Sequence, residues 1–212
     1  MTFVYKNPLN FMKLSPVVRY LKGHRGFIAG GAFKYLLLDE KPKDLDVYFQ
    51  NEADFKQAVA FFSERENFDS SYMNDKVVAF VEKETNLRIE LIRSIYGKPS
   101  EIISLFDFTL TKFALYYDNL FNEENGETDS ELNPEDFNSY SIVLHELFFE
   151  DLMMKRLQID DQILYPTSTW ERSYKYRDYG YKLCRESELK LLDALKLEGE
   201  SEMSRSFYNG FD

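Results

Sequence analysis

The stretch FIAGGAFKYLLLDEKPKDLDVYF, residues 27–49, decides the fold expected of this chain. It opens on a short apolar run that ends in two glycines, a pattern typical of a buried strand leading into a tight turn. Apolar residues at helical spacing follow directly: Ala32, Phe33, Leu36 and Leu37. The segment DLDVYF, 44–49, then alternates carboxylates with apolar side chains, which predicts a strand with two distinct faces. Together these segments predict one α/β unit.

Two features of this unit indicate chemistry. Gly30 and Gly31 allow a ligand to approach the backbone, and the N–H groups at the following helix start favour a phosphate, with the charge of Lys34 one turn further on. Asp44 and Asp46 project from one strand face, about 6.5–7 Å apart, a spacing that suits divalent cations. Each feature alone is usually only turn chemistry or a solvated strand face. Their combination in this order is far more specific.

The surrounding sequence alternates between the two kinds of element. It predicts a short helix over 15–23, an amphipathic helix over 55–62, and a hairpin of strands 77–83 and 86–94. From residue 140 onward the apolar spacing predicts helix only. The fold class expected is therefore α/β or α+β, a small mixed sheet with helices followed by a helical C-terminal region.

Composition divides the chain into three parts. We expect a catalytic domain over 1–121, an acidic linker or loop over 122–139 and the helical region over 140–212. The net charge is −11, but eleven of the 37 acids lie between Lys112 and Lys155, a stretch with no Lys or Arg. The other 26 acids balance the 26 bases, so the overall charge does not exclude a local basic groove.

Several protein classes are excluded by composition. No stretch approaches the roughly 20 apolar residues of a membrane span, and the first residues lack the apolar core of a signal peptide. One cysteine, Cys184, and two histidines argue against a disulfide framework and a structural zinc site. The sequence predicts a cytoplasmic protein with no membrane partner.

The order GGxxR followed by a DxD strand resembles the nucleotidyltransferase superfamily of DNA polymerase β, most closely the head domain of CCA-adding enzymes and bacterial poly(A) polymerases. Gly30, Gly31, Asp44 and Asp46 match, and Lys34 replaces the Arg, which keeps the charge but loses the planar fork. The resemblance implies that Asp44 and Asp46 hold Mg²⁺ or Mn²⁺. It also implies that Gly30, Gly31 and Lys34 position the phosphates of an NTP such as ATP.

The superfamily usually adds a third carboxylate from a later strand. Glu90, in LRIELI, is the candidate for this catalytic and metal-binding role. The alternative is an exposed glutamate paired with Arg88 on the solvent face of an edge strand, and the sequence does not decide between the two.

A second segment, FDFTLTKFALYYD over 106–118, is similar to the RRDFTINALAYD motif of the same head domains, although the basic pair is absent. In the family this motif lies beside the ribose and phosphates of the nucleotide. The resemblance therefore implies that Asp107, Thr109 and Lys112 bind nucleotide. Asp107 is equally suited to cap a helix.

The family reads the incoming base with an EDxxR motif, which this chain matches only in part. Glu150 and Asp151 are present, but the next arginine, Arg156, is two residues out of register. The sequence therefore predicts looser base selection than in CCA-adding enzymes.

The helical region instead carries YPTSTWERSYKYRDYGYKL over 165–183. Arg172 and Lys175 stand among aromatic residues there, a composition that suits nucleotide stacking or a single-stranded end. The alternative is a helix whose rings pack inward while its bases face water. The short tail also resembles small phage-borne nucleotidyltransferase-like proteins.

The resemblance implies transfer of a nucleoside monophosphate from an NTP to a hydroxyl acceptor, with release of pyrophosphate. The acceptor expected first is an RNA 3′ end, as in tRNA processing. Two alternatives stay open: a toxin-like modifier of a protein or of a particular RNA, and an inactive module that binds a nucleotide or a partner.

Overall fold

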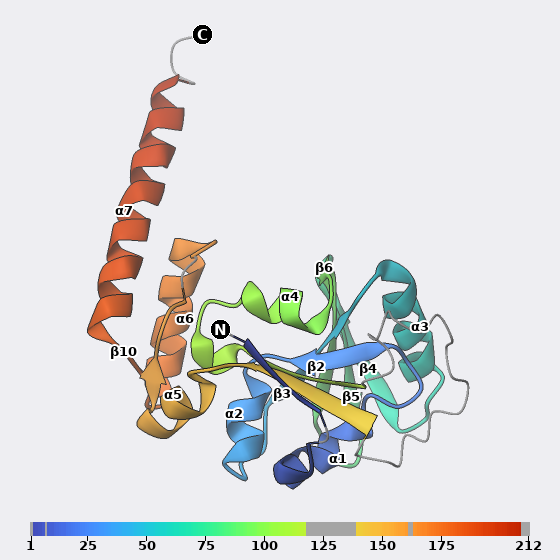
Figure 1. Ribbon diagram of the computed structural model, residues 1–212. Helices are drawn as coiled ribbons and strands as arrows, with labels where there is room; N and C mark the ends of the chain where they lie inside the picture. Colours follow the sequence, from blue (N-terminus) through green and yellow to red (C-terminus); the bar gives the residue numbers. More distant parts are fainter. Residues whose placement is uncertain (1, 7, 118–138, 161–162, 209–212) are drawn as a thin grey trace. The chain divides into compact units, whose positions relative to one another are not determined.

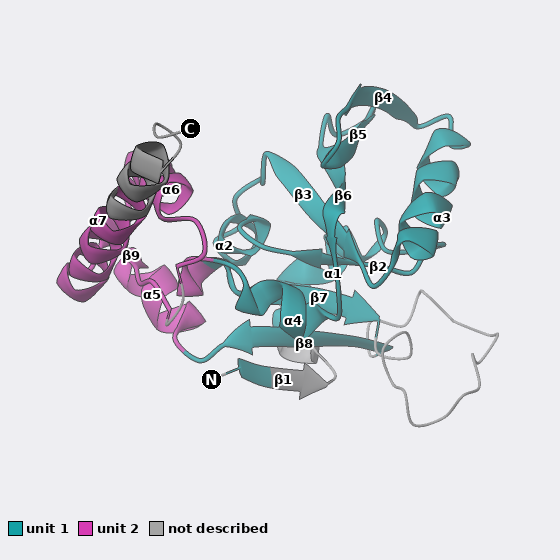
Figure 2. Ribbon diagram, turned by 90° about the horizontal axis from the view of Figure 1, so that it is seen from above, with its two compact units in different colours: residues 1–106, 111–146 teal, residues 107–110, 147–212 magenta. Residues whose placement is uncertain are grey.

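The computed structural model describes residues 2–6, 8–117, 139–160 and 163–208. The chain forms two compact units, shown in different colours in Figure 2. The first unit comprises residues 1–106 and 111–146, and the second comprises 107–110 and 147–212.

The first unit contains an eight-stranded sheet among the described residues (Figure 1). The strands lie in the order β1-β8-β7-β2-β3-β6-β5-β4, with β3 and β6 parallel and the other neighbouring pairs antiparallel. Their bounds are β1 Thr2–Lys6, β2 Gly26–Ala29, β3 Asp44–Phe49, β4 Phe68–Met73, β5 Val77–Glu82, β6 Arg88–Tyr96, β7 Phe113–Tyr117 and β8 Tyr140–His145.

Helices cover both faces of this sheet. They are the 3-10 helix η1 Pro8–Leu14 and the α-helices α1 Ser15–Val18, α2 Ala32–Leu37, α3 Glu52–Ser63 and α4 Pro99–Ser104. Figure 1 shows α4 and α2 on opposite sides of the sheet. On the α4 side, Ile102 and Ile103 pack with Ala114 and Tyr116 of β7. On the other side Phe113 of β7 stacks on a ring of α2, so no side chain of β7 is left exposed.

The helix α3 follows from its local sequence. Asn51 caps its N-terminus, because the side-chain oxygen accepts a hydrogen bond of 3.0 Å from the Asp54 N–H. Phe55, Ala58 and Phe62 recur at helical spacing and are buried, which fixes the face that α3 turns toward the sheet.

The second unit is mainly helical. It contains α5 Phe148–Met154, α6 Pro166–Asp178, α7 Arg185–Tyr208 and the short parallel pair β9 Arg156–Leu157 and β10 Lys182–Leu183. The 3-10 helix η2, Thr109–Thr111, crosses the boundary between the units. Phe108 is buried, with its ring 5.4 Å from that of Tyr176 on α6, and Leu157 and Leu191 of the same unit are fully buried.

The expected fold class, a mixed sheet with helices followed by a helical region, is confirmed. The prediction of helix from residue 140 onward is wrong for Tyr140–His145, which forms β8 inside the sheet. All six side chains of β8 are buried, including Ser141 and His145, so the strand shows no alternation of apolar and polar residues that would distinguish it from a helix. The units therefore divide the chain at residue 146, whereas the sequence places the boundary at 140. Apart from residue 139, the expected linker over 122–139 lies outside the described residues.

Candidate active site

The two aspartates lie on one face of β3. Leu45 and Val47 are fully buried, whereas Asp44 and Asp46 alternate with them and are half-buried. Tyr48 continues the same face, and its ring packs against the cluster beneath α4. The aspartates therefore belong to the α4 side of the sheet, with their carboxylates partly open to solvent.

The glycine turn lies directly beside this pair. Gly30 follows β2, which is antiparallel to β3, and it has φ of +101°, a conformation that an L side chain rarely adopts. A Cβ built on Gly30 would lie 3.6 Å from Oδ2 of Asp46. The Gly30 N–H donates a hydrogen bond of 3.0 Å to the Phe113 carbonyl, so this N–H takes part in the pairing of β2 with β7. Gly31 follows as the N-cap residue of α2.

Lys34 brings positive charge to the same turn. The side chain is buried, its Nζ donates to the Gly31 carbonyl at 3.0 Å, and it lies 3.9 Å from the centre of the Tyr35 ring. The structure thus places Gly30 beside Asp46 and brings Lys34 to Gly31, the next residue of the same turn.

Glu90 fits the first interpretation in its position and the second only in its partner, because β6 lies between β3 and β5 rather than at an edge and Glu90 is half-buried rather than exposed. It pairs in parallel register with Asp46 on the neighbouring strand, so the two side chains share a face. Its Oε1 also lies 3.5 Å from Nη1 of Arg88 and accepts a hydrogen bond of 2.7 Å from the Tyr72 hydroxyl. Burial and that bond to a carboxylate raise the pKa of Tyr72 to about 12. Glu90 is therefore next to the aspartates but already has partners.

The donor chemistry of Asp44 and Asp46 fits a divalent cation. Carboxylate oxygens are the ligands that Mg²⁺ and Mn²⁺ prefer, and both groups are half-buried on one face. Within the described part of the chain, no group of three His, Cys, Asp or Glu side chains lies close enough to hold a metal. A metal bound here would therefore take its ligands from the two aspartates and from the bound substrate.

The remaining predicted site residues divide between the two units. Lys112 belongs to the first, where it is buried and its Nζ donates at 2.9 Å to the carbonyl of Ser104, the last residue of α4. A cation at that position suits a helix C-terminus. Asp107, Thr109, Arg172 and Lys175 belong to the second unit.

In the second unit the structure brings two predicted residues together. The Arg172 Nε donates to Oδ2 of Asp107 at 2.6 Å. Asp107 is buried by this pair, whereas Arg172 and Lys175 on α6 are exposed. Thr109 is buried and its hydroxyl donates to Asp151.

The acid pair and the out-of-register arginine also meet. Arg156 Nε lies 2.5 Å from Oδ1 of Asp151, and its Nη2 lies 2.9 Å from Oε1 of Glu150. The hydrogen bond with Asp151, the largest cause, raises the pKa of Arg156. Lys155 ends α5 with φ of +50°, and this left-handed residue turns the chain so that Arg156 reaches back. The two-residue shift therefore does not prevent the contact.

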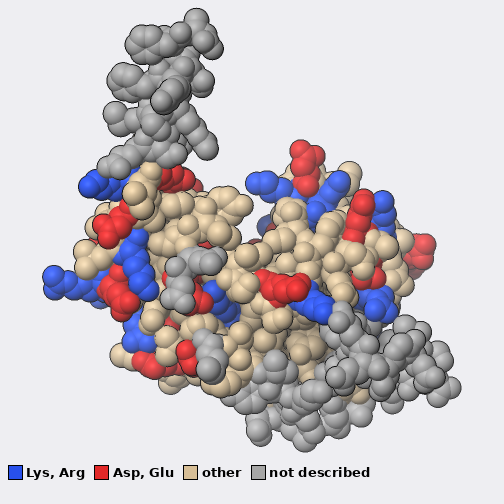
Figure 3. Space-filling model, turned by 45° about the horizontal axis from the view of Figure 1, so that its top comes forward, with Lys and Arg blue, Asp and Glu red and all other residues tan. Residues whose placement is uncertain are grey.

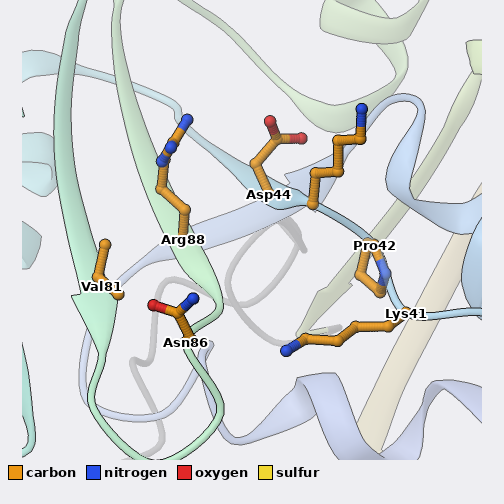
Figure 4. Close-up of a pocket in the computed structure, with 7 residues that line it drawn as sticks. Lys41, Pro42, Asp44, Val81, Asn86 and Arg88 are labelled. Atoms are coloured by element: carbon orange, nitrogen blue, oxygen red, sulfur yellow. The ribbon is translucent and has the colours of Figure 1, made fainter.

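A pocket of about 470 Å³ lies beside Asp44 in the first unit (Figure 4). Three of its lining residues are basic; the full lining is Lys41, Pro42, Lys43, Asp44, Val81, Asn86 and Arg88. Sequence reasoning missed Lys41 and Lys43 as site residues, although two lysines directly before the aspartate strand are a visible signal.

A profile of the Gabija anti-defense 2 family matches residues 5–155. The chain belongs to the Gabija anti-defense 2 family. A curated relative from this family, Gabija anti-defense 2 of Bacillus phage SPbetaL7, is 25% identical over 183 residues. The alignment covers 85% of this chain and 40% of that relative.

The fold of this family member is similar to that of CCA-adding enzymes. A CCA-adding enzyme in complex with CTP superposes with a TM-score of 0.59 at 18% identity, over 96% of this chain and 49% of the enzyme. The Thermotoga maritima CCA-adding enzyme complexed with tRNA gives 0.55 at 18% identity, over 92% and 46%. The chain thus spans about half the length of these enzymes, and the likeness to them is one of fold. None of the helices in the described residues is long and apolar enough to cross a membrane.

Proposed function

We propose that this chain carries a metal-dependent nucleotidyltransferase site. The observation that supports this proposal best is the position of Gly30, because a Cβ built on this residue would lie 3.6 Å from Oδ2 of Asp46. It brings a phosphate-binding turn and a carboxylate pair to one place, as transfer of a nucleotidyl group requires. The likeness in fold to CCA-adding enzymes supports the same reaction class.

Each residue would have a distinct role. Gly31 and Lys34 would bind and orient the phosphates of the NTP, so that pyrophosphate leaves in line with the attacking hydroxyl. Asp44 and Asp46 would hold Mg²⁺ or Mn²⁺, which supplies a Lewis acid that polarises the phosphoryl oxygens and acidifies the acceptor hydroxyl. Glu90 would accept the proton of that hydroxyl, once the acceptor hydroxyl replaces the Tyr72 hydroxyl as its hydrogen-bond donor. Asp107, Thr109, Lys112, Arg172 and Lys175 remain proposed nucleotide-binding residues.

The acceptor we propose is the 3′ end of an RNA. Solved relatives in fold contain tRNA, and one is a tRNA nucleotidyltransferase with a primer tRNA and an incoming ATP analog. The family name adds that the reaction would serve to counter Gabija defence. A protein acceptor in the host is the alternative within the same reaction class.

Labelled nucleotides test the proposal directly. The protein is incubated with each α-³²P-labelled NTP, Mg²⁺ or Mn²⁺, and a mixture of cellular RNA and protein. Label in RNA is the expected result, and label in protein identifies the alternative acceptor. Asp46→Asn should abolish the signal, whereas Asp69→Asn, an exposed acid on β4, should leave it unchanged.

A second candidate, a metal-independent binding module, has one specific observation in its favour. Glu90 is bound by Tyr72 and Arg88, and the described residues contain no ready cluster of three metal ligands. Such a module would bind NTP equally with and without Mg²⁺ and would label no acceptor.

A further inference from the structure

The pocket beside Asp44 is basic although the whole protein is acidic. Its lining contains three cations and one carboxylate, which leaves a net charge of +2 on a protein of net charge −11. On the face that Figure 3 draws, acids and bases are mixed. Its volume of about 470 Å³ lies within the range of small-ligand sites.

The two walls of the pocket are tied together. One wall is the segment before β3 and the other is formed by β5, the β5–β6 turn and the start of β6. Lys41 extends from the first wall toward Asn86, and its Nζ donates to the carbonyl of Thr85 in the turn (Figure 4). This hydrogen bond therefore joins the two walls of the pocket.

The β5–β6 turn is also fixed from within the fold. The buried carboxylate of Glu82 accepts hydrogen bonds from Thr85 at 2.5 Å, from Tyr20 at 2.7 Å and from Arg19 at 2.8 Å. These bonds hold the turn that carries Asn86 and leads into Arg88. Preformed geometry of this kind reduces the entropy that binding costs.

The pocket and the glycine turn lie on opposite flanks of the aspartate strand. The sheet order is β2-β3-β6, with Gly30 following β2 and Arg88 opening β6 in register with Asp44. Figure 4 shows the charged ends of Arg88 and Asp44 pointing the same way. Two substrates must meet at the aspartates, and the glycine flank is assigned to the NTP. The β6 flank is then the place for the acceptor.

We propose that Lys43 and Arg88 form a subsite for a backbone phosphate of the acceptor, with Lys41 adding positive charge elsewhere in the same pocket, and that the acceptor is therefore a nucleic-acid strand. This inference rests on the proposed function, since it assigns the acceptor to the site that the function requires. Arg88 offers a planar fork that suits phosphate oxygens, and the lysines add point charge. Contacts to phosphate position a strand without reading its sequence, so binding through this pocket would be independent of sequence.

Binding without NTP tests the subsite separately from catalysis. The affinity of the full chain for a 5′-fluorescein single-stranded RNA of about twelve nucleotides is measured by anisotropy. Arg88→Gln and the pair Lys41→Gln with Lys43→Gln should each weaken binding by at least about tenfold. The slope of log K against log salt should also fall by about 0.7 for each phosphate that the variant no longer binds. The control is Lys56→Gln, an exposed lysine on α3.

Four results decide the matter. Loss of RNA affinity in the pocket variants, with ATP affinity and melting temperature unchanged, supports the subsite. Loss of ATP affinity alone overturns it, because the pocket then serves the NTP. Unchanged RNA affinity, or no RNA binding by the wild type, also overturns it and favours a protein acceptor. Pocket-dependent RNA binding without any nucleotide transfer keeps the phosphate site but refutes the proposed function. Since Lys41 also bridges the walls, Lys43→Gln alone repeats the test without disturbing that bond.

Discussion

At the scale of single residues, Asp44 and Asp46 determine whether the site is catalytic. Both carboxylates are half-buried on one strand face, where their like charges repel each other. We therefore expect Asp44→Asn and Asp46→Asn to leave the melting temperature unchanged or slightly raised. Transfer should fall by at least about 100-fold, equivalent to about 2.7 kcal/mol in the barrier.

The measurement is incorporation of labelled nucleotide into acceptor at saturating NTP and Mg²⁺, with Asp69→Asn as the control for an exposed acid. Full activity in either aspartate variant would exclude the metal-dependent mechanism.

His24 makes the stability of the first unit dependent on pH. Its Nδ1 accepts from the Gly26 N–H at 3.0 Å, and its Nε2 lies 2.8 Å from the Tyr20 carbonyl, so the neutral ring donates through Nε2. Burial lowers the pKa of His24 to about 4. Between about pH 6.5 and pH 4 the unfolded chain binds a proton that the folded chain does not. The free energy of unfolding should therefore fall by about 3 kcal/mol as the pH is lowered through this window.

Urea unfolding of the wild type and of His24→Asn at pH 7, 6, 5 and 4.5 measures this effect. The asparagine oxygen keeps an acceptor near Gly26 but does not titrate, so the variant should show a shallower dependence on pH. Burial raises the pKa of Asp54, which acts in the opposite direction in both proteins, so the difference between them isolates His24. Parallel curves would contradict the assignment.

Some residues of the candidate site could be predicted from the sequence and others could not. Gly30, Lys34 and the aspartates were predictable because one short stretch carries them all. The pocket was not, because Arg88 comes from β6 and meets Lys41 and Lys43 only through the parallel pairing of β3 with β6. Contacts across such a long crossover leave no local pattern.

At the scale of elements, burial of every side chain removed the strand pattern from β7 and β8, whereas β3 kept it. In β3, apolar residues alternate with Asp44 and Asp46, and a period of two is a strand signal. In β7 and β8 every side chain is buried, because α4 covers one face and α2 stacks on Phe113 from the other. The sequence of β7 is continuously apolar and that of β8 includes the buried Ser141 and His145, so neither shows the period of two that would identify a strand.

We expect the turn after α5 to stabilise the second unit through the contacts of Asp151. Asp151 is fully buried and bonds with both Arg156 and Thr109. Arg156→Met would leave this carboxylate with one partner fewer, and we expect a loss of about 2 kcal/mol in the free energy of unfolding. The loss should stay below the value for fully buried pairs, since a quarter of the Arg156 side chain is exposed.

Urea unfolding at pH 7 measures this loss against Lys190→Met, which removes an exposed i,i+4 pair with Glu186 on α7. The control should change stability by no more than about 0.5 kcal/mol. Equal effects of the two substitutions would show that the Arg156 pair is only a surface contact.

At the scale of the whole molecule, the acidic charge and the proposed nucleic-acid acceptor are compatible. Eleven acids lie in the stretch between Lys112 and Lys155, and the remaining acids and bases balance. A polyanion is therefore repelled by one part of the sequence and attracted by the pocket, which favours a defined approach over general electrostatic binding. Association with RNA should consequently be weaker and less salt-dependent than for a basic nucleic-acid-binding protein.

The metal dependence of NTP binding is the property of the whole molecule that separates a nucleotidyltransferase from a binding module. Without a cation, Asp44 and Asp46 repel the triphosphate, whereas a bound Mg²⁺ neutralises the charge of the two carboxylates. A ligand at 100 times its dissociation constant stabilises the folded state by about 2.7 kcal/mol, which raises the melting temperature of a chain of this size by roughly 5–10 °C. For the wild type we expect a shift in melting temperature of this order with ATP and Mg²⁺ together, and only a small shift with ATP and EDTA. For Asp46→Asn, the shift with ATP and Mg²⁺ should be no larger than the small shift with ATP and EDTA. Equal shifts with and without Mg²⁺ in the wild type would instead establish a metal-independent site, in which Glu90 stays bound to Tyr72 and Arg88 and the aspartates have no catalytic part.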